Sequence, residues 1–253
     1  MAKYINVEVD QTTSDLLAEM SIEFFGGKRK IRPGDVIRSR IGSVVEEYSR
    51  HPTKLLMHSG SFSYASDNGR SLLGMATGRY CSVAVGIRVM NGHHPMEALT
   101  TNPWHYGDFY KEGNIPADFV YRGERPAFPQ EYGPVKVGHD VWVGSHCTLM
   151  SGKQISTGAV IAGGANVTSD VPPYAIVGGN PAKVIRYRFP DEIIQRLLES
   201  KWWEISPKLL RDFNVFEVEE TLDAIDRLRQ SGEAIEFTPR KLKVTAKGLE
   251  EAS

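Results

Sequence analysis

Between residues 137 and 172, aliphatic side chains return at every sixth position of the chain. The series consists of Val137, Val143, Leu149, Ile155, Ile161 and Val167. A second, mostly small or apolar series follows four positions behind and consists of Val141, Cys147, Lys153, Ala159, Ala165 and Val171. A period of six fits neither an amphipathic helix nor an alternating strand, whose apolar faces return after 3.6 and 2 residues. We interpret the repeat as a chain that winds round a triangular prism, with one unit on each face and both series inside.

The same phase occurs upstream, and it is interrupted once. Residues 77–82 and 83–88 repeat the pattern, and Val89 begins another unit. Between residues 93 and 134 the period is lost in a segment rich in aromatic residues and proline. Loops of this length inside a compact domain are usually functional or disordered, and the aromatic content argues against disorder. We therefore expect chemistry at this insert.

The periodicity divides the chain into three parts. Residues 1–56 lack it and are expected to form a partly strand-forming lead-in that caps the first coil. Residues 57–189 are expected to form a β-helix domain that contains the insert 93–134. Residues 190–253 begin with helical spacing, which predicts α-helices that cover the exposed edge of the last coil. They end in a polar, lysine-rich tail that is expected to be mobile.

Composition narrows the possible partners. The formal net charge of the 253 residues is −1 at pH 7, and no basic run indicates a nucleic-acid partner. No apolar stretch approaches the length of a membrane span, and the N-terminus has no signal-peptide pattern. Cys81 and Cys147 fall in the small-residue series, so we expect inert core thiols and a cytoplasmic protein.

Three strings of the sequence carry a family resemblance. They are GRYCSVA at residues 78–84, GHDVWVGS at 138–145 and DVPPYAIVGGNPAKVIR at 170–186. With these strings the chain resembles the hexapeptide-repeat acyltransferases, and among them the xenobiotic (chloramphenicol/streptogramin-type) O-acetyltransferases. The resemblance covers roughly residues 57–205. It implies a mainly β fold, a left-handed parallel β-helix with a long loop insert and C-terminal α-helices.

The resemblance also implies an activity and an assembly. Such enzymes move acetyl from acetyl-CoA, a co-substrate, to an acceptor hydroxyl by direct attack and without a metal. Their active sites lie between subunits, so we expect a homotrimer. The acceptor is open at this point: it is a hydroxyl-bearing small molecule or a saccharide. Acetylation of an antibiotic and N-acetylation of an amino sugar are alternatives on the same site.

A histidine stands at the mouth of the insert, directly after a coil. Attack of a hydroxyl on a thioester needs a general base, and the unperturbed pKa of histidine suits this role near neutral pH. The resemblance aligns the family's His-Pro-x-acidic motif with residues 94–97. It implies that His94 is the base and that Glu97 is its acidic partner, where the family more often has Asp. From the residues alone, His94 could be a loop histidine bonded to backbone, and His93 has at best a supporting role.

Four residues are candidates for acceptor binding. Tyr64 matches a Ser-Tyr pair near the family's acceptor pocket, although an ordinary packed tyrosine explains it equally well. Trp104 and Tyr106 lie in the insert, where their rings could stack on a sugar or a bulky antibiotic. His93 is the fourth, by its position beside His94.

The resemblance places the coenzyme A contacts on the repeats and on the segment after them. The predicted residues are Trp142, Ser145, Gly163, Gly164, Thr168, Ser169, Lys183 and Arg186. Small residues let a pantetheine arm lie against the backbone, and Trp142 points outward to a thioester channel or a subunit interface. Lys183 and Arg186 can pair with phosphates, although a solvated charge pair is the simpler alternative.

A different class of function is a metal-dependent relative on the same scaffold, such as a γ-class carbonic anhydrase. Its zinc would need three converging histidines. His94, His139 and His146 are the available set on coils, and the spacing of the last two does not place them on one coil face. A non-catalytic scaffold is a third alternative, which His94 and the Lys183/Arg186 pair argue against.

Overall fold

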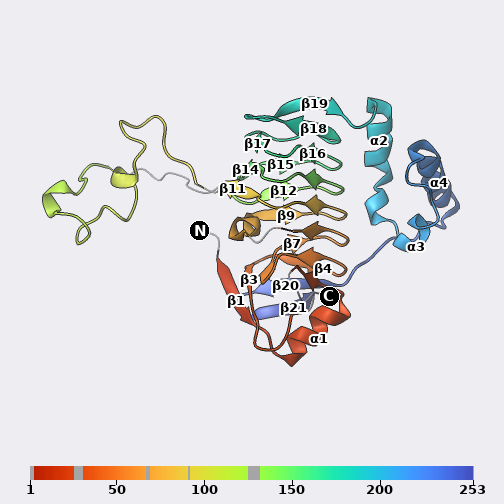
Figure 1. Cartoon of the computed structure of the whole chain (residues 1–253), viewed down its shortest axis with the longest axis horizontal. Helices are drawn as coiled ribbons and strands as arrows, with labels where there is room; N and C mark the ends of the chain where they lie inside the picture. Colours follow the sequence, from red (N-terminus) through yellow and green to blue (C-terminus); the bar gives the residue numbers. More distant parts are fainter. Residues whose placement is uncertain (1–2, 26–30, 67–68, 91, 125–131, 253) are drawn as a thin grey trace.

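The computed structural model describes residues 3–25, 31–66, 69–90, 92–124 and 132–252. Within them the chain is mainly β, and most strands form a coil whose successive strands visit three sheets in turn (Figure 1). One circuit consists of β9 (Met75–Thr77), β10 (Ser82–Val83) and β11 (Arg88–Met90). The next consists of β12 (Val135–Val137), β13 (Trp142–Val143) and β14 (Thr148–Met150). A further circuit consists of β15 (Gln154–Ile155), β16 (Val160–Ile161) and β17 (Asn166–Val167).

Neighbouring circuits pair in parallel and in register. On one face β13 lies between β10 and β16, so that Val143 is the partner of both Val83 and Ile161. The other two faces align Val89, Leu149 and Val167, and Thr77, Val137 and Ile155. All of these residues are at most 7% exposed. The six-residue repeat is therefore confirmed as one unit per face with the aliphatic series inside.

The second series also faces the interior, with one exception. Val141, Cys147, Ala159, Ala165 and Val171 are buried. Both cysteines are free, and burial raises the pKa of the Cys81 thiol to about 12, so it stays protonated. Lys153 is only half-buried, because an ammonium group reaches water rather than the apolar interior.

Two corners of the coil turn through left-handed backbone at successive levels, and the third does so at Gly152. At one of them, the aromatic corner, the residues of successive circuits are Tyr48, Phe62, Tyr80, Asp140, Gly158 and Tyr174, with φ between 53° and 75°. Backbone hydrogen bonds link each of these levels to the next. At the other, the glycine corner, the residues are Gly86, His146 and Gly164, with φ of 77°, 60° and 75°. In each case the left-handed residue turns the chain onto the next face just before a buried side chain.

Coil strands begin further upstream than residue 57. β4 (Val44–Glu46), β5 (Arg50–His51), β7 (His58–Ser59) and β8 (Tyr64–Ala65) extend two of the sheets. β2 (Glu23–Phe24) pairs with β5. The lead-in also contains α1 (Gln11–Glu19) and a small sheet of β1 (Tyr4–Glu8), β3 (Val36–Arg40) and β6 (Leu55–Leu56). The unit before residue 57 escaped the sequence pattern because polar Ser49 occupies its interior position. Ser59 and Ser63 do the same in the next circuit, which lies within the predicted β-helix domain, and all three serines are buried and hydrogen-bonded in part to backbone.

The C-terminal part differs from its prediction in two ways. The last coil strand, β18 (Ala175–Gly178), is covered by the antiparallel strand β19 (Lys183–Tyr187), whereas the helices lie along the side of the coil (Figure 1). The lysine-rich tail is a hairpin of β20 (Lys241–Thr245) and β21 (Gly248–Ala252), and β20 pairs with β4. Leu242 and Val244 are buried against the lead-in, which accounts for the order of this segment.

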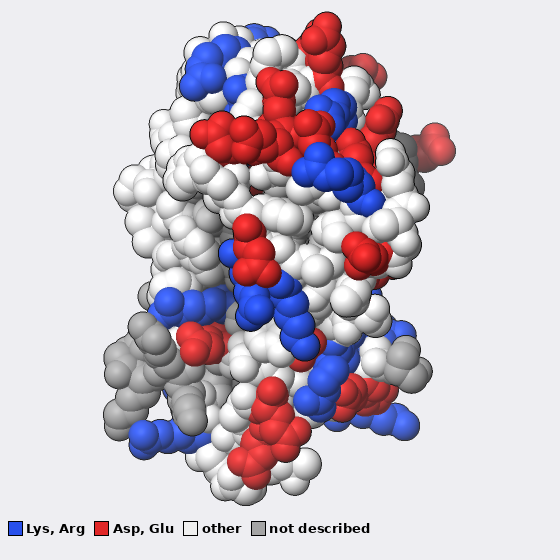
Figure 2. All heavy atoms as spheres, turned by 90° about the vertical axis from the view of Figure 1, so that its right-hand side faces the viewer, with Lys and Arg blue, Asp and Glu red and all other residues white. Residues whose placement is uncertain are grey.

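Four helical segments follow the coil, and shorter ones interrupt the chain elsewhere. The former are α2 (Asp191–Ser200), the 3₁₀ turn η4 (Trp202–Glu204), α3 (Pro207–Leu210) and α4 (Val218–Ser231). The 3₁₀ turns η1 (Arg70–Gly74), η2 (Pro103–His105) and η3 (Ala117–Phe119) lie upstream. α2 and α4 bury Ile194, Leu197 and Leu222 with Tyr174, while acidic side chains gather on their outer surface at the top of Figure 2. Among the described residues, no helix is both long and apolar enough to cross a membrane.

Candidate active site

The insert leaves the coil after β11 and carries His94 near its start. The Nδ1 atom of His94 lies 2.7 Å from the Tyr106 hydroxyl oxygen and 3.0 Å from the Thr101 carbonyl oxygen. The Tyr106 hydroxyl also donates to Thr101 at 3.4 Å, which leaves its oxygen to accept from a protonated Nδ1. In that tautomer Nε2 carries a free lone pair, and His94 is exposed. The imidazole is thus arranged to accept a proton from a substrate.

The other residues predicted around His94 have different roles. Glu97 is exposed, and the hydrogen bonds of His94 run to Thr101 and Tyr106 instead. Tyr106, predicted to stack on an acceptor, is therefore a direct partner of the imidazole. His93 packs edge-on against Tyr132 at 4.3 Å between ring centroids, and its Nε2 is buried without a hydrogen-bond partner. Sequence reasoning missed Thr101 because the contact is made by a backbone carbonyl, which carries no side-chain signal.

The predicted acceptor residues lie on two separate parts of the molecule. Trp104 donates from Nε1 to the Phe119 carbonyl at 2.9 Å and packs edge-on against Tyr121, within a shallow aromatic hollow of the insert. Tyr64 and Trp142 project from the coil, one on each side of Ser82, and are 42% and 58% exposed. The insert extends away from the coil in Figure 1, so one chain does not bring these two groups together.

Several predicted coenzyme residues form a continuous row, which we call the backbone lane. It consists of the predicted Ser145, Gly163, Gly164 and Lys183, together with Gly178, which was not predicted. Gly164 donates its N–H to the Ser145 carbonyl, Gly178 lies beside Ala162 of the next circuit, and Lys183 pairs with Gly178. A Cβ atom at Gly164 would meet nothing within 4 Å, so the backbone is open to a ligand here. The lane therefore leaves room for an extended ligand beside Gly164.

The remaining predicted coenzyme residues lie outside the lane. Thr168 and Ser169 follow β17 at a different corner of the coil. Arg186 lies on β19 beside Ile176 and is exposed, and its guanidinium donates to the Tyr187 carbonyl at 3.1 Å. Lys183 and Arg186 share the strand that ends the coil, where both cations are available to an anion.

A buried charged cluster joins the coil to the C-terminal segment, and sequence reasoning did not find it. Arg79 forms two hydrogen bonds to Glu46, at 2.8 and 3.1 Å, and donates to the Trp203 and Phe237 carbonyls. Burial acts to raise the pKa of Glu46, but the hydrogen bonds from Arg79 and Ser61 outweigh it and hold that pKa below its ordinary value. The cluster joins four distant parts of the sequence, so no local motif could reveal it.

His139 belongs to this cluster rather than to a metal site. Its ring stacks on Trp203 at 4.8 Å, and Nδ1 accepts the Arg79 backbone N–H at 3.1 Å. Burial, and then the charge of Arg79, lower its pKa to about 4. His146 is exposed at the glycine corner, and His94 lies on the insert. In the part of the chain that the structure describes, no three His, Cys, Asp or Glu side chains are grouped to hold a metal.

Comparisons with known proteins give relatives by sequence and by structure. The chain is 38% identical over 137 residues to a probable macrolide acetyltransferase of Lysinibacillus sphaericus. The matched region makes up 53% of this chain and 72% of that protein. The chain is 42% identical over 132 residues to a chloramphenicol acetyltransferase of Agrobacterium fabrum, across 51% of this chain and 59% of that protein. The chain thus spans about three-fifths of the length of that relative. No protein-family model matches the chain.

Two solved structures resemble the chain at lower identity. One is a maltose O-acetyltransferase from Clostridium difficile 630, with 21% identity and a TM-score of 0.37, over 72% of this chain and 78% of that chain. The other is a galactoside acetyltransferase in complex with coenzyme A, with 20% identity and a TM-score of 0.35, over 72% and 76% of the two chains.

Proposed function

Because the chain belongs to the xenobiotic (chloramphenicol/streptogramin-type) hexapeptide-repeat acetyltransferases, we propose that it moves acetyl from acetyl-CoA to an acceptor hydroxyl. The observation that carries the proposal is His94, whose Nδ1 lies within hydrogen-bonding distance of Tyr106 and Thr101 while the ring is exposed. A fixed tautomer with a free Nε2 is what a general base for a neutral hydroxyl requires.

The reaction follows from that geometry. Nε2 of His94 accepts the hydroxyl proton as the acceptor oxygen attacks the thioester carbonyl. The tetrahedral intermediate collapses with cleavage of the carbon–sulfur bond, and the proton on Nε2 passes to the leaving sulfur. The products are the acetyl ester and free coenzyme A, and no acyl-enzyme forms. Thr101 and Tyr106 hold the ring in one orientation throughout, whereas Glu97 is proposed to act only through the local field of its carboxylate.

Acetyl-CoA is proposed to lie along the backbone lane. Its pantetheine arm would pass Ser145, Gly163 and Gly164, and at Gly164 the chain offers open backbone. Lys183 and Arg186 would meet the phosphates, with Thr168, Ser169 and Trp142 contributing from neighbouring coils. The separation of the insert from the coil within one chain supports a homotrimer, in which the insert of one subunit reaches the coil of the next. We further propose that the coil is left-handed, as in the family.

For the acceptor we propose a saccharide-type hydroxyl, bound between Tyr64 of the coil and Trp104 of the insert. The relatives named for chloramphenicol and macrolides make an antibiotic hydroxyl the first alternative, and an amino sugar nitrogen the second. The γ-carbonic-anhydrase alternative gains no support, because His94, His139 and His146 lie on different parts of the fold.

The proposal is tested by following free thiol release from acetyl-CoA with a panel of sugars, amino sugars, chloramphenicol and a macrolide. We expect saturable, acceptor-dependent thiol release with at least one hydroxyl compound. Calorimetry with coenzyme A, on the wild type and on Lys183→Ala/Arg186→Ala, separates donor binding from acceptor choice. A wild-type chain that neither binds coenzyme A nor releases thiol with any acceptor would refute the function.

A further inference from the structure

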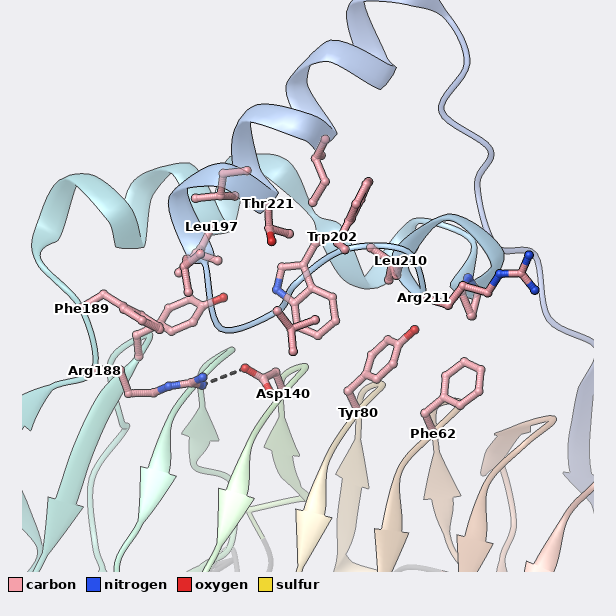
Figure 3. Close-up of a pocket in the computed structure, with 17 residues that line it drawn as sticks. Phe62, Tyr80, Asp140, Arg188, Phe189, Leu197, Trp202, Leu210, Arg211 and Thr221 are labelled. Carbon is pink, nitrogen blue, oxygen red and sulfur yellow. Dashed lines mark hydrogen bonds and ion pairs between the residues drawn. The ribbon is translucent and has the colours of Figure 1, made fainter.

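A pocket of about 590 Å³ lies between the aromatic corner of the coil and the C-terminal helices (Figure 3). Phe62, Tyr80 and Asp140 line it from the coil, and Arg188 and Phe189 from the segment after β19. The helical segments contribute mainly apolar residues, which include Leu197, Trp202, Val218 and Leu222. Its volume falls within the range of about 300–1,000 Å³ that is typical of small-molecule sites.

The pocket follows from the way the aromatic corner is built. Left-handed turns point the side chains of Phe62 and Tyr80 outward, and their rings stack at 5.0 Å between centroids. The next level of the corner is Asp140, so the row of rings stops there. Trp202 packs on Tyr80 at 4.9 Å and bridges to the helices above the gap. The helices therefore span a hollow instead of packing on a continuous aromatic surface.

Two hydroxyls in this hollow lack an acceptor. The oxygens of Tyr80 and Tyr174 are buried and have no hydrogen-bond partner, and Tyr174 is only 1% exposed. The Trp202 side chain interacts with the Tyr174 hydroxyl. An indole N–H can only donate a hydrogen bond, so the proton of the Tyr174 hydroxyl still has no acceptor. In Figure 3 the Tyr80 hydroxyl points into the space beneath Trp202 and Leu210. A buried unpartnered donor is costly, so a ligand with an acceptor atom would satisfy it.

The charges around the pocket are already paired. Arg188 and Asp140 form an ion pair of 2.8 Å at its base, and Arg211 lies 3.6 Å from Asp212 at its edge. The outer surface of α2 and α4 is acidic (Figure 2). An anion would meet this acidic surface, and a cation would enter an apolar space without a free counter-ion. The pocket accordingly suits an uncharged molecule.

We propose that this pocket binds an uncharged, mainly aromatic small molecule that carries a carbonyl-type oxygen. The rings of Phe62, Tyr80, Phe189 and Trp202 provide edges and faces for aromatic contacts. The hydroxyl of Tyr80 or that of Tyr174 donates to the carbonyl oxygen. The bound molecule joins the C-terminal helices to the coil, so it raises the stability of that junction. The helices that line the pocket lie on the side of the coil opposite the insert (Figure 1), and the proposal does not rest on acetyl transfer.

The test compares two uncharged probes of similar shape on the purified full chain. Benzophenone has a carbonyl between two phenyl rings, and diphenylmethane lacks that oxygen. We expect ligand-observed NMR titrations to give saturable binding of both, with benzophenone tighter by roughly 2- to 12-fold, as one net hydrogen bond would give. The variant Tyr80→Phe/Tyr174→Phe should lose this preference and keep its affinity for diphenylmethane. Neither hydroxyl donates to an acceptor among the described residues, so the variant breaks no such bond and is expected to fold.

A variant that fills the pocket tests whether the two probes bind there. Val218→Trp places a large side chain in the pocket and should abolish binding of both probes. Glu220→Trp, on the exposed side of the same helix, is its matched control and should bind both normally. Circular dichroism monitors the fold of each variant. No saturable binding to the wild type, binding that survives Val218→Trp in a folded protein, or an undiminished benzophenone preference in the double phenylalanine variant would each overturn the proposal.

Discussion

The aromatic corner and the glycine corner have the same backbone and opposite surroundings. Tyr80 and Asp140 at the first, and His146 at the second, have φ of 61°, 53° and 60°. The first corner carries bulky side chains and lies beneath the C-terminal helices. The second carries Gly86 and Gly164, and a Cβ atom at Gly164 would meet only open space. The turn requires left-handed backbone at both corners, but the neighbouring structure determines which side chain occupies it.

One repeat can therefore provide both a packed support and an open backbone surface. Non-glycine residues in left-handed conformation cost roughly 1–2 kcal/mol each. At the aromatic corner, ring contacts such as Phe62 on Tyr80 offset that cost. At the glycine corner Gly86 and Gly164 avoid that cost while His146 bears it, and the backbone at Gly164 is left bare. The coil is therefore closed on one side by packing and open on another.

Removing a ring should break the closed side. Tyr80→Ala deletes the contacts with Phe62 and Trp202, at 5.0 and 4.9 Å. We expect the free energy of unfolding to fall by about 2–3 kcal/mol, below the usual 3–5 for a fully buried aromatic residue, because Tyr80 is half-buried. Urea denaturation measures the change. Phe109→Ala, at a ring that is 68% exposed on the insert, is the control and should change little.

Adding a ring should close the open side. Gly164→Phe is expected to weaken coenzyme A binding by roughly 5- to 150-fold, which corresponds to about 1–3 kcal/mol of steric conflict in the lane. Gly42→Phe is the matched control, because Gly42 also has positive φ and open space around its Cβ position, yet lies far from the lane in the sequence and fold. Calorimetry compares the two. Equal coenzyme A affinity in both variants would mean that the lane is placed wrongly.

Acid should loosen the closed side through His139. Its pKa is about 4 in the folded chain and about 6.5 when unfolded, so the unfolded state takes up the proton first as pH falls. The stabilisation is complete above pH 6.5 and is lost as pH falls from 6.5 to 4. Because the ring is partly exposed, we expect about 1–2 kcal/mol from this residue. Urea denaturation at pH 7 and 4.5 should show a smaller loss in His139→Gln than in the wild type.

The sequence predicted what depends on repeated local geometry. The interior positions of Val143, Leu149 and Ile161 follow from the six-residue period. The helix that begins after Pro190 follows from the helical spacing of its apolar residues. The hairpin of β20 and β21 was missed because its strands are polar on one side and are ordered only by pairing with β4, nearly 200 residues upstream. The Arg79–Glu46 pair was missed for the same reason.

The candidate site was predictable in part. The resemblance to the family selected His94 and the lane residues Ser145, Gly163, Gly164 and Lys183, and their roles stay predictions. The partners of His94 were not predictable, since they depend on how the insert folds back on itself. Tyr106 was selected as a stacking residue and instead lies 2.7 Å from the imidazole.

The most direct test of the account is the rate of thiol release by His94→Ala on the true acceptor. Loss of a general base should lower turnover by roughly 10²–10⁴-fold, while acetyl-CoA binding persists. His93→Ala, at the neighbouring histidine that packs on Tyr132, should be much milder. Wild-type turnover by His94→Ala, or an inactive His93→Ala with intact fold, would contradict the account.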